Sequence, residues 1–160
     1  MYKVKGKWAL ITGAARGIGY LTAKFMVSQG CNLILHSRDL KHTEKVLSEV
    51  QDMGVSARAV AADLNDLTAV ERMLGEIDAM GVQVDIVLNN AALQIAYRTD
   101  YLTTPPSDYE ISFRVNTIAP AMIIPNSVAQ LLERSFKLLL YNTRVSHEAG
   151  LQELDRACQV

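Results

Sequence analysis

The stretch that decides the fold reads Thr12-Gly13-Ala14-Ala15-Arg16-Gly17-Ile18-Gly19. It follows the apolar run Trp8–Ile11, which predicts a short buried strand, and it leads into residues with helical spacing. Gly13 permits a tight turn, and Gly17 and Gly19 open the helix with no Cβ atom between the backbone and a ligand. The first N–H groups of a helix and its dipole favour a phosphate at such a place. The stretch therefore predicts a pyrophosphate-binding loop, with an ordinary glycine-rich turn as the alternative.

Segments of strand length alternate with segments of helical spacing along the chain. Strands are predicted at residues 8–11, 32–36, 57–62, 84–88 and 137–141, and helices at residues 18–30, 46–53 and 70–77. Gly54 and Gly81 follow two of these helices, as glycine commonly does at a helix end. This alternation predicts an α/β fold, in which a parallel sheet of about five strands has helices on both faces.

A further, longer helix is predicted from Ser107 to about Arg134. Ser107 and Glu110 have the spacing of a capping box at its start. Pro120 and Pro125 have no N–H group for the helical ladder. Each proline is therefore expected to bend the helix and to leave the carbonyl four residues earlier without its donor.

Composition limits the kinds of partner. The 160-residue chain has 16 Lys and Arg residues against 17 Asp and Glu residues, a formal charge of −1. No basic block indicates nucleic acid or an anionic membrane, and no run approaches the roughly 18 apolar residues of a membrane span. Cys31 and Cys158 are the only cysteines, which argues against a disulfide scaffold or a cysteine-rich zinc site. We expect one cytoplasmic domain over residues 1–160, with a small-molecule ligand and no metal.

Further motifs follow the loop in order. Asp63 follows the third predicted strand, Asn89-Asn90-Ala91-Ala92 follows the fourth, and Asn116 lies in the longer helix. Together with the Gly-x-x-x-Gly-x-Gly spacing of the loop, these motifs make residues 6–142 resemble the short-chain dehydrogenase/reductase family, whereas residues 143–160 diverge. The resemblance implies a Rossmann-like doubly wound sheet and an oxidoreductase that uses a dinucleotide on carbonyl or alcohol substrates.

The resemblance also implies which residues contact the cofactor. The glycine-rich loop would hold the pyrophosphate, Asp63 would reach the adenine, and the stretch ending in Ala92, where the family has glycine, would lie beside the cofactor. The implied cofactor-binding residues are Gly13, Arg16, Gly17, Ile18, Gly19, Ser37, Arg38, Asp63, Leu64, Asn90, Ala91 and Ala92.

Two residues after the second predicted strand favour NADP over NAD. An NAD site typically places a carboxylate there to bind the ribose 2′-hydroxyl, and this chain has Ser37 instead. The guanidinium of Arg38 can pair with a 2′-phosphate, and Arg16 in the loop adds positive charge. The alternative is that Arg38 is a surface residue paired with Asp39 or Glu44.

Asp63 and Asn116 each have a structural alternative. Asp63 stands beside Asn65 and Asp66, so it can also be a helix cap. Asn116 resembles the family's active-site asparagine, whose main chain is opened to hold a water, and Pro120 supports such an opening. The alternative for Asn116 is an amide satisfied by local hydrogen bonds in a kinked helix.

The catalytic part of the resemblance is incomplete. The family uses a tyrosine as general acid, with a lysine four residues later and a serine about thirteen residues before it. Thr143 or Ser146 is the candidate for the serine, but Arg156 and Gln159 stand where the tyrosine is required. The chain is therefore expected to be truncated relative to the family, with Asn116 as its remaining catalytic candidate.

Tyr20 and Lys24 form the only Tyr-x-x-x-Lys in the sequence. They lie in the helix that follows the glycine-rich loop, whereas the family's pair lies after the fifth strand. We reject this pair as an active site, because a motif outside its structural context is a coincidence of spacing.

The function predicted from these residues is that of an NADP-dependent oxidoreductase of the short-chain type. The alternatives are a nucleotide-binding module without catalysis and an inactive truncated remnant. Because the segments that follow in the family are not recognisable after Val145, the helix predicted from Ser107 is expected to expose apolar groups. A homo-oligomer formed through that helix is therefore expected.

Overall fold

The described residues form a five-stranded parallel sheet in the order β3-β2-β1-β4-β5. The computed structural model describes residues 4–96, 101–124 and 138–141. The strands are β1 (Trp8–Ile11), β2 (Asn32–Ser37), β3 (Ala57–Ala61), β4 (Val84–Asn89) and β5 (Leu138–Tyr141). Each strand lies where it was predicted, so the prediction of an α/β fold with a parallel sheet is confirmed.

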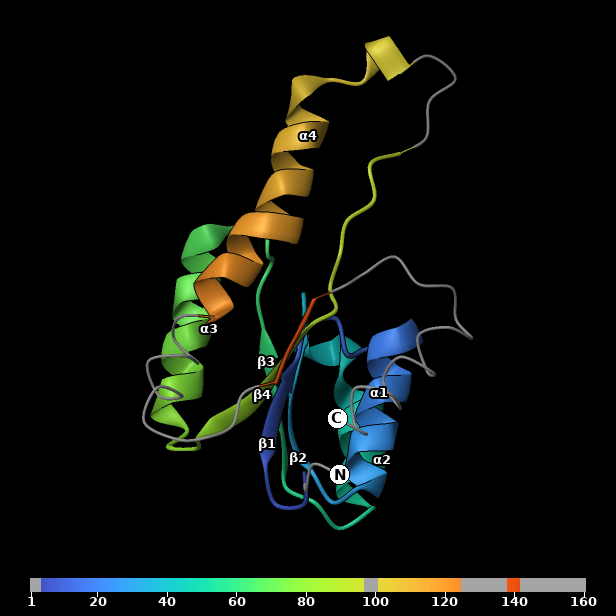
Figure 1. Ribbon diagram of the computed structural model, residues 1–160, viewed down its shortest axis with the longest axis vertical. Helices are drawn as coiled ribbons and strands as arrows, with labels where there is room; N and C mark the ends of the chain where they lie inside the picture. Colours follow the sequence, from blue (N-terminus) through green and yellow to red (C-terminus); the bar gives the residue numbers. More distant parts are fainter. Residues whose placement is uncertain (1–3, 97–100, 125–137, 142–160) are drawn as a thin grey trace.

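Helices cover both faces of this sheet (Figure 1). The helices α1 (Gly17–Ser28) and α2 (Glu44–Gln51) lie on one face, α3 (Leu67–Ala79) lies on the other, and α4 (Pro106–Phe113) extends beyond the sheet. Short helical turns occur at η1 (Leu40–His42) and η2 (Tyr101–Thr103). Within the part of the chain that the structure describes, no helix has the length and apolar character needed to cross a bilayer.

The sheet separates two apolar clusters. In β2, Leu33 and Leu35 pack in the cluster that contains α1 and α2, whereas Ile34 packs in the cluster that contains α3. In β4, Leu88 and Val87 divide in the same way between the two faces. Because successive side chains point to opposite faces, a strand buried on both faces has a continuous apolar sequence.

The winding of the chain reverses at β1. From β1 the chain proceeds to β2 and then β3 on one side, whereas β4 and β5 lie on the other side. The carboxyl ends of β1 and β4 are neighbours, because Ile11 is in register with Leu88. Ligands of open α/β sheets bind at such a switch point, outside the carboxyl ends of the strands.

The start of α4 differs from the prediction. The N-cap is Pro105, Pro106 is the first helical residue, and no side chain caps the helix, so the capping box at Ser107 and Glu110 is wrong. Proline suits the first helical position because its φ is already fixed near the helical value and its missing N–H needs no partner there. Pro105 itself is extended, with ψ at 146°, as a residue before proline prefers.

A π-helix, η3 (Arg114–Ile118), continues from α4 and surrounds Asn116. The Ala119 N–H donates to the Arg114 carbonyl, and residues 119–124 are again α-helical. Because Pro120 has no N–H, the Asn116 carbonyl lacks its normal donor, which matches the predicted break in the helical ladder. The predicted end at Arg134 and the bend at Pro125 lie outside the described residues.

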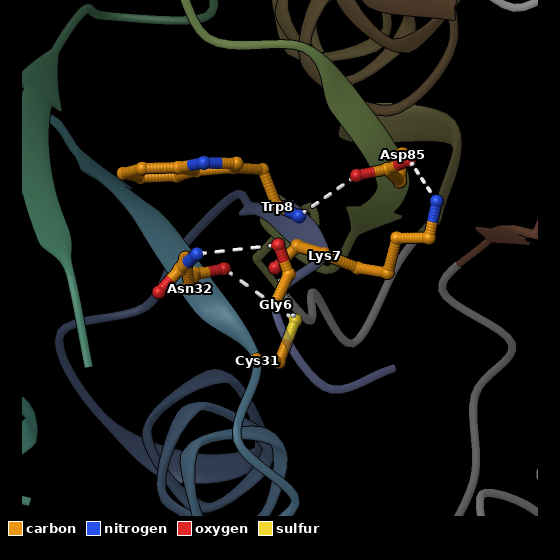
Figure 2. A network of polar contacts seen from close by, with 6 residues as sticks. All are labelled: Gly6, Lys7, Trp8, Cys31, Asn32 and Asp85. Atoms are coloured by element: carbon orange, nitrogen blue, oxygen red, sulfur yellow. Dashed lines mark hydrogen bonds and ion pairs between the residues drawn. The ribbon is translucent and has the colours of Figure 1, made fainter. Parts of the chain in front are cut away.

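A polar network ties the amino ends of β1, β2 and β4 together (Figure 2). The pairing of β1 with β4 passes over Asp85, because Trp8 is in register with Val84 and Ala9 with Ile86. The Asp85 carboxylate accepts the Trp8 N–H at 2.9 Å and pairs with the Lys7 ammonium group at 2.9 Å. This irregularity therefore gives the first amide of β1 a charged acceptor.

Cys31 also belongs to this end of the sheet (Figure 2). Its buried thiol donates to the Lys7 carbonyl at 3.2 Å, and burial raises the pKa of the thiol to about 12. Cys31 is therefore a protonated structural residue at neutral pH. Cys158 lies outside the described residues.

Asp85→Ala is expected to lower the free energy of unfolding by about 1.5–3 kcal/mol, the range for a hydrogen bond to a charged group. Asp85→Asn keeps an acceptor oxygen for the Trp8 N–H and is expected to lose less. Urea denaturation followed by the fluorescence of Trp8, the single tryptophan, measures both changes. Asp52→Ala removes an exposed carboxylate after α2 and is the control, expected to change stability by at most about 0.5 kcal/mol. Equal losses for Asp85→Ala and Asp52→Ala would contradict the anchoring role.

Candidate functional site

A cavity of about 800 Å³ lies at the carboxyl ends of the strands. The glycine-rich loop forms one wall, and residues 36–38, 63–65 and 90–93, which follow or end β2, β3 and β4, form the others. Ile111 of α4 and Val115 of η3 add apolar surface. The cavity therefore lies at the switch point, and its size is within the usual range for small-molecule sites.

Most of the residues predicted to bind a cofactor line this cavity. All of them do so except Ile18 and Gly19. The sequence interpretation did not include Ala15, His36, His42 or Leu93, which line it as well. His36 directly precedes Ser37 at the end of β2, so its position in the strand was an available signal. Nothing in the sequence indicated the lining residues of α4 and η3, which lie far from the loop along the chain.

The N-terminus of α1 has no side-chain cap. Its N-cap is Arg16, whose backbone is extended and whose side chain makes no capping hydrogen bond, and the first turn contains no acidic residue. By contrast, α3 is capped by Asp66, which accepts the N–H groups of Thr68 and Ala69. Because Arg16 and Gly17 line the cavity, the first N–H groups of α1 remain available to an anion there.

Gly17 and Gly19 lack a side chain for different reasons. Gly17 has φ at +59°, and a Cβ added to it would meet no atom within 4 Å, so its side of the cavity has room for a ligand atom. A Cβ on Gly19 would lie 2.3 Å from the Gly13 oxygen and 2.6 Å from Asn90 Nδ2. A side chain at Gly19 is therefore excluded by the protein's own backbone at Gly13, and contact of Gly19 with a phosphate stays a prediction.

The residues that follow β4 bind the first turn of the glycine-rich loop. Asn90 Nδ2 donates to the Thr12 oxygen at 2.9 Å and to the Gly13 oxygen at 3.2 Å. The Thr12 hydroxyl in turn accepts the Ala91 N–H at 3.0 Å. These bonds place the Asn-Asn-Ala-Ala stretch directly against the first turn of the loop. A Cβ on Gly13 would also be crowded there, at 3.0 Å from Ala91 Cα.

The imidazole of His36, near the end of β2, contacts the glycine-rich loop from the other side. It is 1% exposed, with Nε2 at 3.0 Å from the Ala62 oxygen and Nδ1 at 3.4 Å from the Gly13 nitrogen. Burial lowers the pKa of His36, and the hydrogen bond to Ala62 opposes part of that change. The imidazole is therefore neutral at physiological pH.

Arg38 lines the cavity and is exposed. The ion pairs among the described residues do not include its guanidinium. Asp39 instead accepts the Lys41 N–H as the cap of η1, and Glu44 lies in the first turn of α2. The alternative in which Arg38 pairs with either carboxylate is therefore wrong. Its charge remains available to an anionic ligand.

Asp63 is not the cap of α3. Its carboxylate accepts the Asn65 N–H at 2.9 Å in a tight turn, whereas Asp66 caps the helix. The structural alternative for Asp63 is wrong in that respect. Asp63 and Leu64 both line the cavity, and their contact with the cofactor stays a prediction.

Asn116 joins η3 to the segment after β4. Its side chain accepts the Leu93 N–H and donates to the Leu93 oxygen, both at 2.8 Å, and it donates to the Ser112 hydroxyl at 3.0 Å. Asn116 itself is not a lining residue of the cavity. Its amide therefore positions Leu93, and a role of its main chain in proton transfer stays a prediction.

The Tyr-x-x-x-Lys of α1 points to α2. Both the Tyr20 hydroxyl and the Lys24 ammonium group donate to the same oxygen of Glu49, at 2.6 Å and 3.1 Å. The hydrogen bond to Glu49 raises the pKa of Tyr20, which is the opposite of what a general acid needs. Neither residue lines the cavity, so the geometry agrees with the rejection of this pair. Thr143 and Ser146 lie outside the described residues.

A family model described as short chain dehydrogenase matches residues 7–137. The chain belongs to this family. It is 30% identical over 131 residues to a fatty acyl-CoA reductase of Acinetobacter baylyi, a match that covers 82% of this chain and 44% of that protein. It is 32% identical over 151 residues to a versicolorin reductase of Emericella nidulans, covering 94% of this chain and 56% of that protein. The chain thus spans about half the length of these curated relatives.

Solved structures of short chain dehydrogenases share the fold. A 3-oxoacyl (acyl-carrier-protein) reductase of Agrobacterium tumefaciens C58, solved with NADP bound, has a TM-score of 0.76 and 25% identity to this chain. The match covers 85% of this chain and 52% of that one.

In this member of the short chain dehydrogenase family, Gly19→Ala is expected to lower the free energy of unfolding by about 1–3 kcal/mol and to weaken dinucleotide binding, because the new Cβ displaces Gly13 and Asn90. Gly75→Ala is the matched control. Gly75 lies in α3 with no atom within 4 Å of an added Cβ, so alanine there is expected to stabilise by about 0.5–1 kcal/mol. Thermal unfolding and cofactor titration measure both variants, and similar behaviour of the two would contradict the packing role of Gly19.

Proposed function

We propose that the chain binds NADP and forms the cofactor-binding part of an oxidoreductase that acts on a carbonyl or alcohol substrate. The observation that carries the proposal is the cavity at the switch point, where an uncapped helix N-terminus lies beside an unpaired arginine. The NADP bound to the Agrobacterium relative and the names of the relatives, which are reductases, support it.

The residues present fit a dinucleotide phosphate. Gly17 and the first N–H groups of α1 would hold the pyrophosphate, because the backbone there is open and carries the positive end of the helix dipole. Arg38 would pair with the 2′-phosphate. Ser37 stands where an NAD site typically has a carboxylate, so no negative charge at that position opposes the phosphate. Asp63 would reach the adenine.

A bound nicotinamide supplies the hydride donor or acceptor of the reaction. The chain's own residues bind and orient it. Ile111 and Val115 give one wall an apolar surface that excludes water, and Asn116 fixes Leu93 beside it. We propose that the opened main chain at Asn116 takes part in proton transfer. Thr143 or Ser146 would provide the hydroxyl group that the family's serine provides.

A second candidate function is NADP binding without turnover. The observation that favours it is that the only Tyr-x-x-x-Lys, at Tyr20 and Lys24, is bound to Glu49 away from the cavity. Losing a general acid typically slows a reaction by about 10²–10⁴-fold.

Arg38→Ala is expected to weaken NADPH binding about tenfold or more and to leave NADH binding unchanged, because only NADPH carries the 2′-phosphate. Arg72→Ala removes an exposed arginine of α3 outside the cavity and is the matched control. NADPH oxidation with a panel of ketones then separates the two candidates, since turnover supports the oxidoreductase and tight binding alone supports the binding module. NADH binding tighter than NADPH would contradict the cofactor choice.

We also propose that the chain associates through α4. Tyr109 and Phe113, four residues apart on this helix, are 53% and 59% exposed. They line a hollow of the surface whose other lining residues are Glu110, Ser112, Asn116 and Thr117. Phe113→Ser is expected to shift the mass measured by light scattering towards the monomer. Leu40→Ser, at a leucine of η1 that is 51% exposed, is expected to leave the mass unchanged. A monomeric parent protein at high concentration would contradict this interface.

A further inference from the structure

His36 contacts the glycine-rich loop through both its side chain and its backbone. Its Nδ1 lies 3.4 Å from the Gly13 nitrogen, and its carbonyl accepts the Ala14 N–H at 2.9 Å. Asn90 binds the carbonyls of the same peptide groups, at Thr12 and Gly13. Two consecutive peptide groups of the loop are thus held at the N–H side by His36 and at the oxygen side by Asn90.

The partners of the imidazole select one protonation state. The Ala62 carbonyl can only accept, so Nε2 carries a hydrogen, and the Gly13 N–H can only donate, so Nδ1 carries none. The neutral Nε2–H tautomer alone satisfies both bonds. In the imidazolium ion, Nδ1–H would face the Gly13 N–H, and the loop would have to move.

We propose that His36 is a positioning residue for the dinucleotide, whose neutral imidazole keeps the glycine-rich loop in its binding conformation and whose protonation releases it. This inference rests on the proposed binding of NADP. Because Gly13 and Gly17 belong to one short loop that lines the cavity, displacement of Gly13 shifts the phosphate-binding backbone at Gly17.

The direction of the pH dependence follows from burial. Burial lowers the pKa of His36, so the folded chain binds fewer protons at this residue than the unfolded chain does near the ordinary imidazole pKa of about 6.5. The neutral state persists below that pH, and affinity is lost as the pH falls through the lowered pKa. The charged and titratable side chains that line the same cavity are Arg16, Arg38, His42 and Asp63.

Two substitutions separate the two bonds of the ring. His36→Asn places an amide oxygen near the position of Nδ1, so it keeps an acceptor for Gly13 and does not titrate. His36→Gln reaches Ala62 with an amide donor and offers Gly13 no acceptor. At pH 7.5 we expect His36→Asn to bind NADP⁺ close to the parent level and His36→Gln to bind it about 3- to 10-fold more weakly, the range for one hydrogen bond.

The test is calorimetric titration of NADP⁺ and NAD⁺ in steps from pH 7.5 down to the lowest pH at which the chain stays folded. The ratio of the parent Kd to the His36→Asn Kd cancels the titration of the ligand itself. We expect this ratio to stay constant near pH 7 and to rise at least about threefold towards the acid end of the range, where the imidazole gains a proton. His42→Gln should still lose NADP⁺ affinity as the pH falls, whatever its affinity at pH 7.5. In the ligand-free chain, long-range ¹H–¹⁵N spectra should show the Nε2–H tautomer.

Several results would overturn the inference. A ratio that is constant with pH, or that falls because a charged imidazole attracts the anionic ligand, would remove the proposed role of His36. An NADP⁺ affinity that does not change with pH in His42→Gln would assign the pH dependence to His42 instead. The absence of NADP⁺ binding to the parent chain at pH 7.5 is a separate outcome, which contradicts the proposed function itself.

Discussion

The two peptide groups that join Thr12, Gly13 and Ala14 are the constraint on which the candidate site depends. Their N–H groups bind His36 at the end of β2, and their oxygens bind Asn90 after β4. β2 and β4 lie on opposite sides of β1, so the loop that leaves β1 is fixed by both neighbours of its own strand. The close packing of Gly19 on Gly13 then sets where α1 begins, and the N-terminus of α1 faces the cavity as a result.

The two ends of the sheet have different roles. At the amino ends, the Asp85 carboxylate accepts the Trp8 N–H and pairs with the Lys7 ammonium group, and the Cys31 thiol donates to the Lys7 carbonyl. The polar groups at this end are therefore bonded to one another. At the carboxyl ends, the N–H groups of α1 and the guanidinium of Arg38 have no such partner among the described residues. Unused donors beside a cavity favour an anionic ligand, and they lie at the switch point where α/β sheets bind one.

The π-helix at Asn116 connects α4 to this site over a long distance in the sequence. Asn116 binds both backbone groups of Leu93, and Ile111 and Val115 bring apolar surface to the same cavity. Both candidate functions begin with dinucleotide binding, which precedes any transfer of hydride. They differ in proton transfer, for which Tyr20 and Lys24 are unsuitable because Glu49 binds both of them.

The strands, the helices that connect them and the glycine-rich loop were predictable from the sequence. The spacing of apolar residues and the backbone freedom of glycine depend only on residues that are close in the chain. The start of α4 was not predictable, because Ser107 has the spacing of a cap but Pro106 already fixes the first helical residue. The tertiary structure alone decided that Gly19 packs on Gly13, that His36 lies under the loop and that α4 and η3 line the cavity. The contacts of His36 and of α4 and η3 join residues far apart in the chain, so they exist only once the order and twist of the strands have brought the segments together. Gly13 and Gly19 are close in the sequence, but Asn90 after β4 packs beside both of them, so their contact also depends on a neighbouring strand.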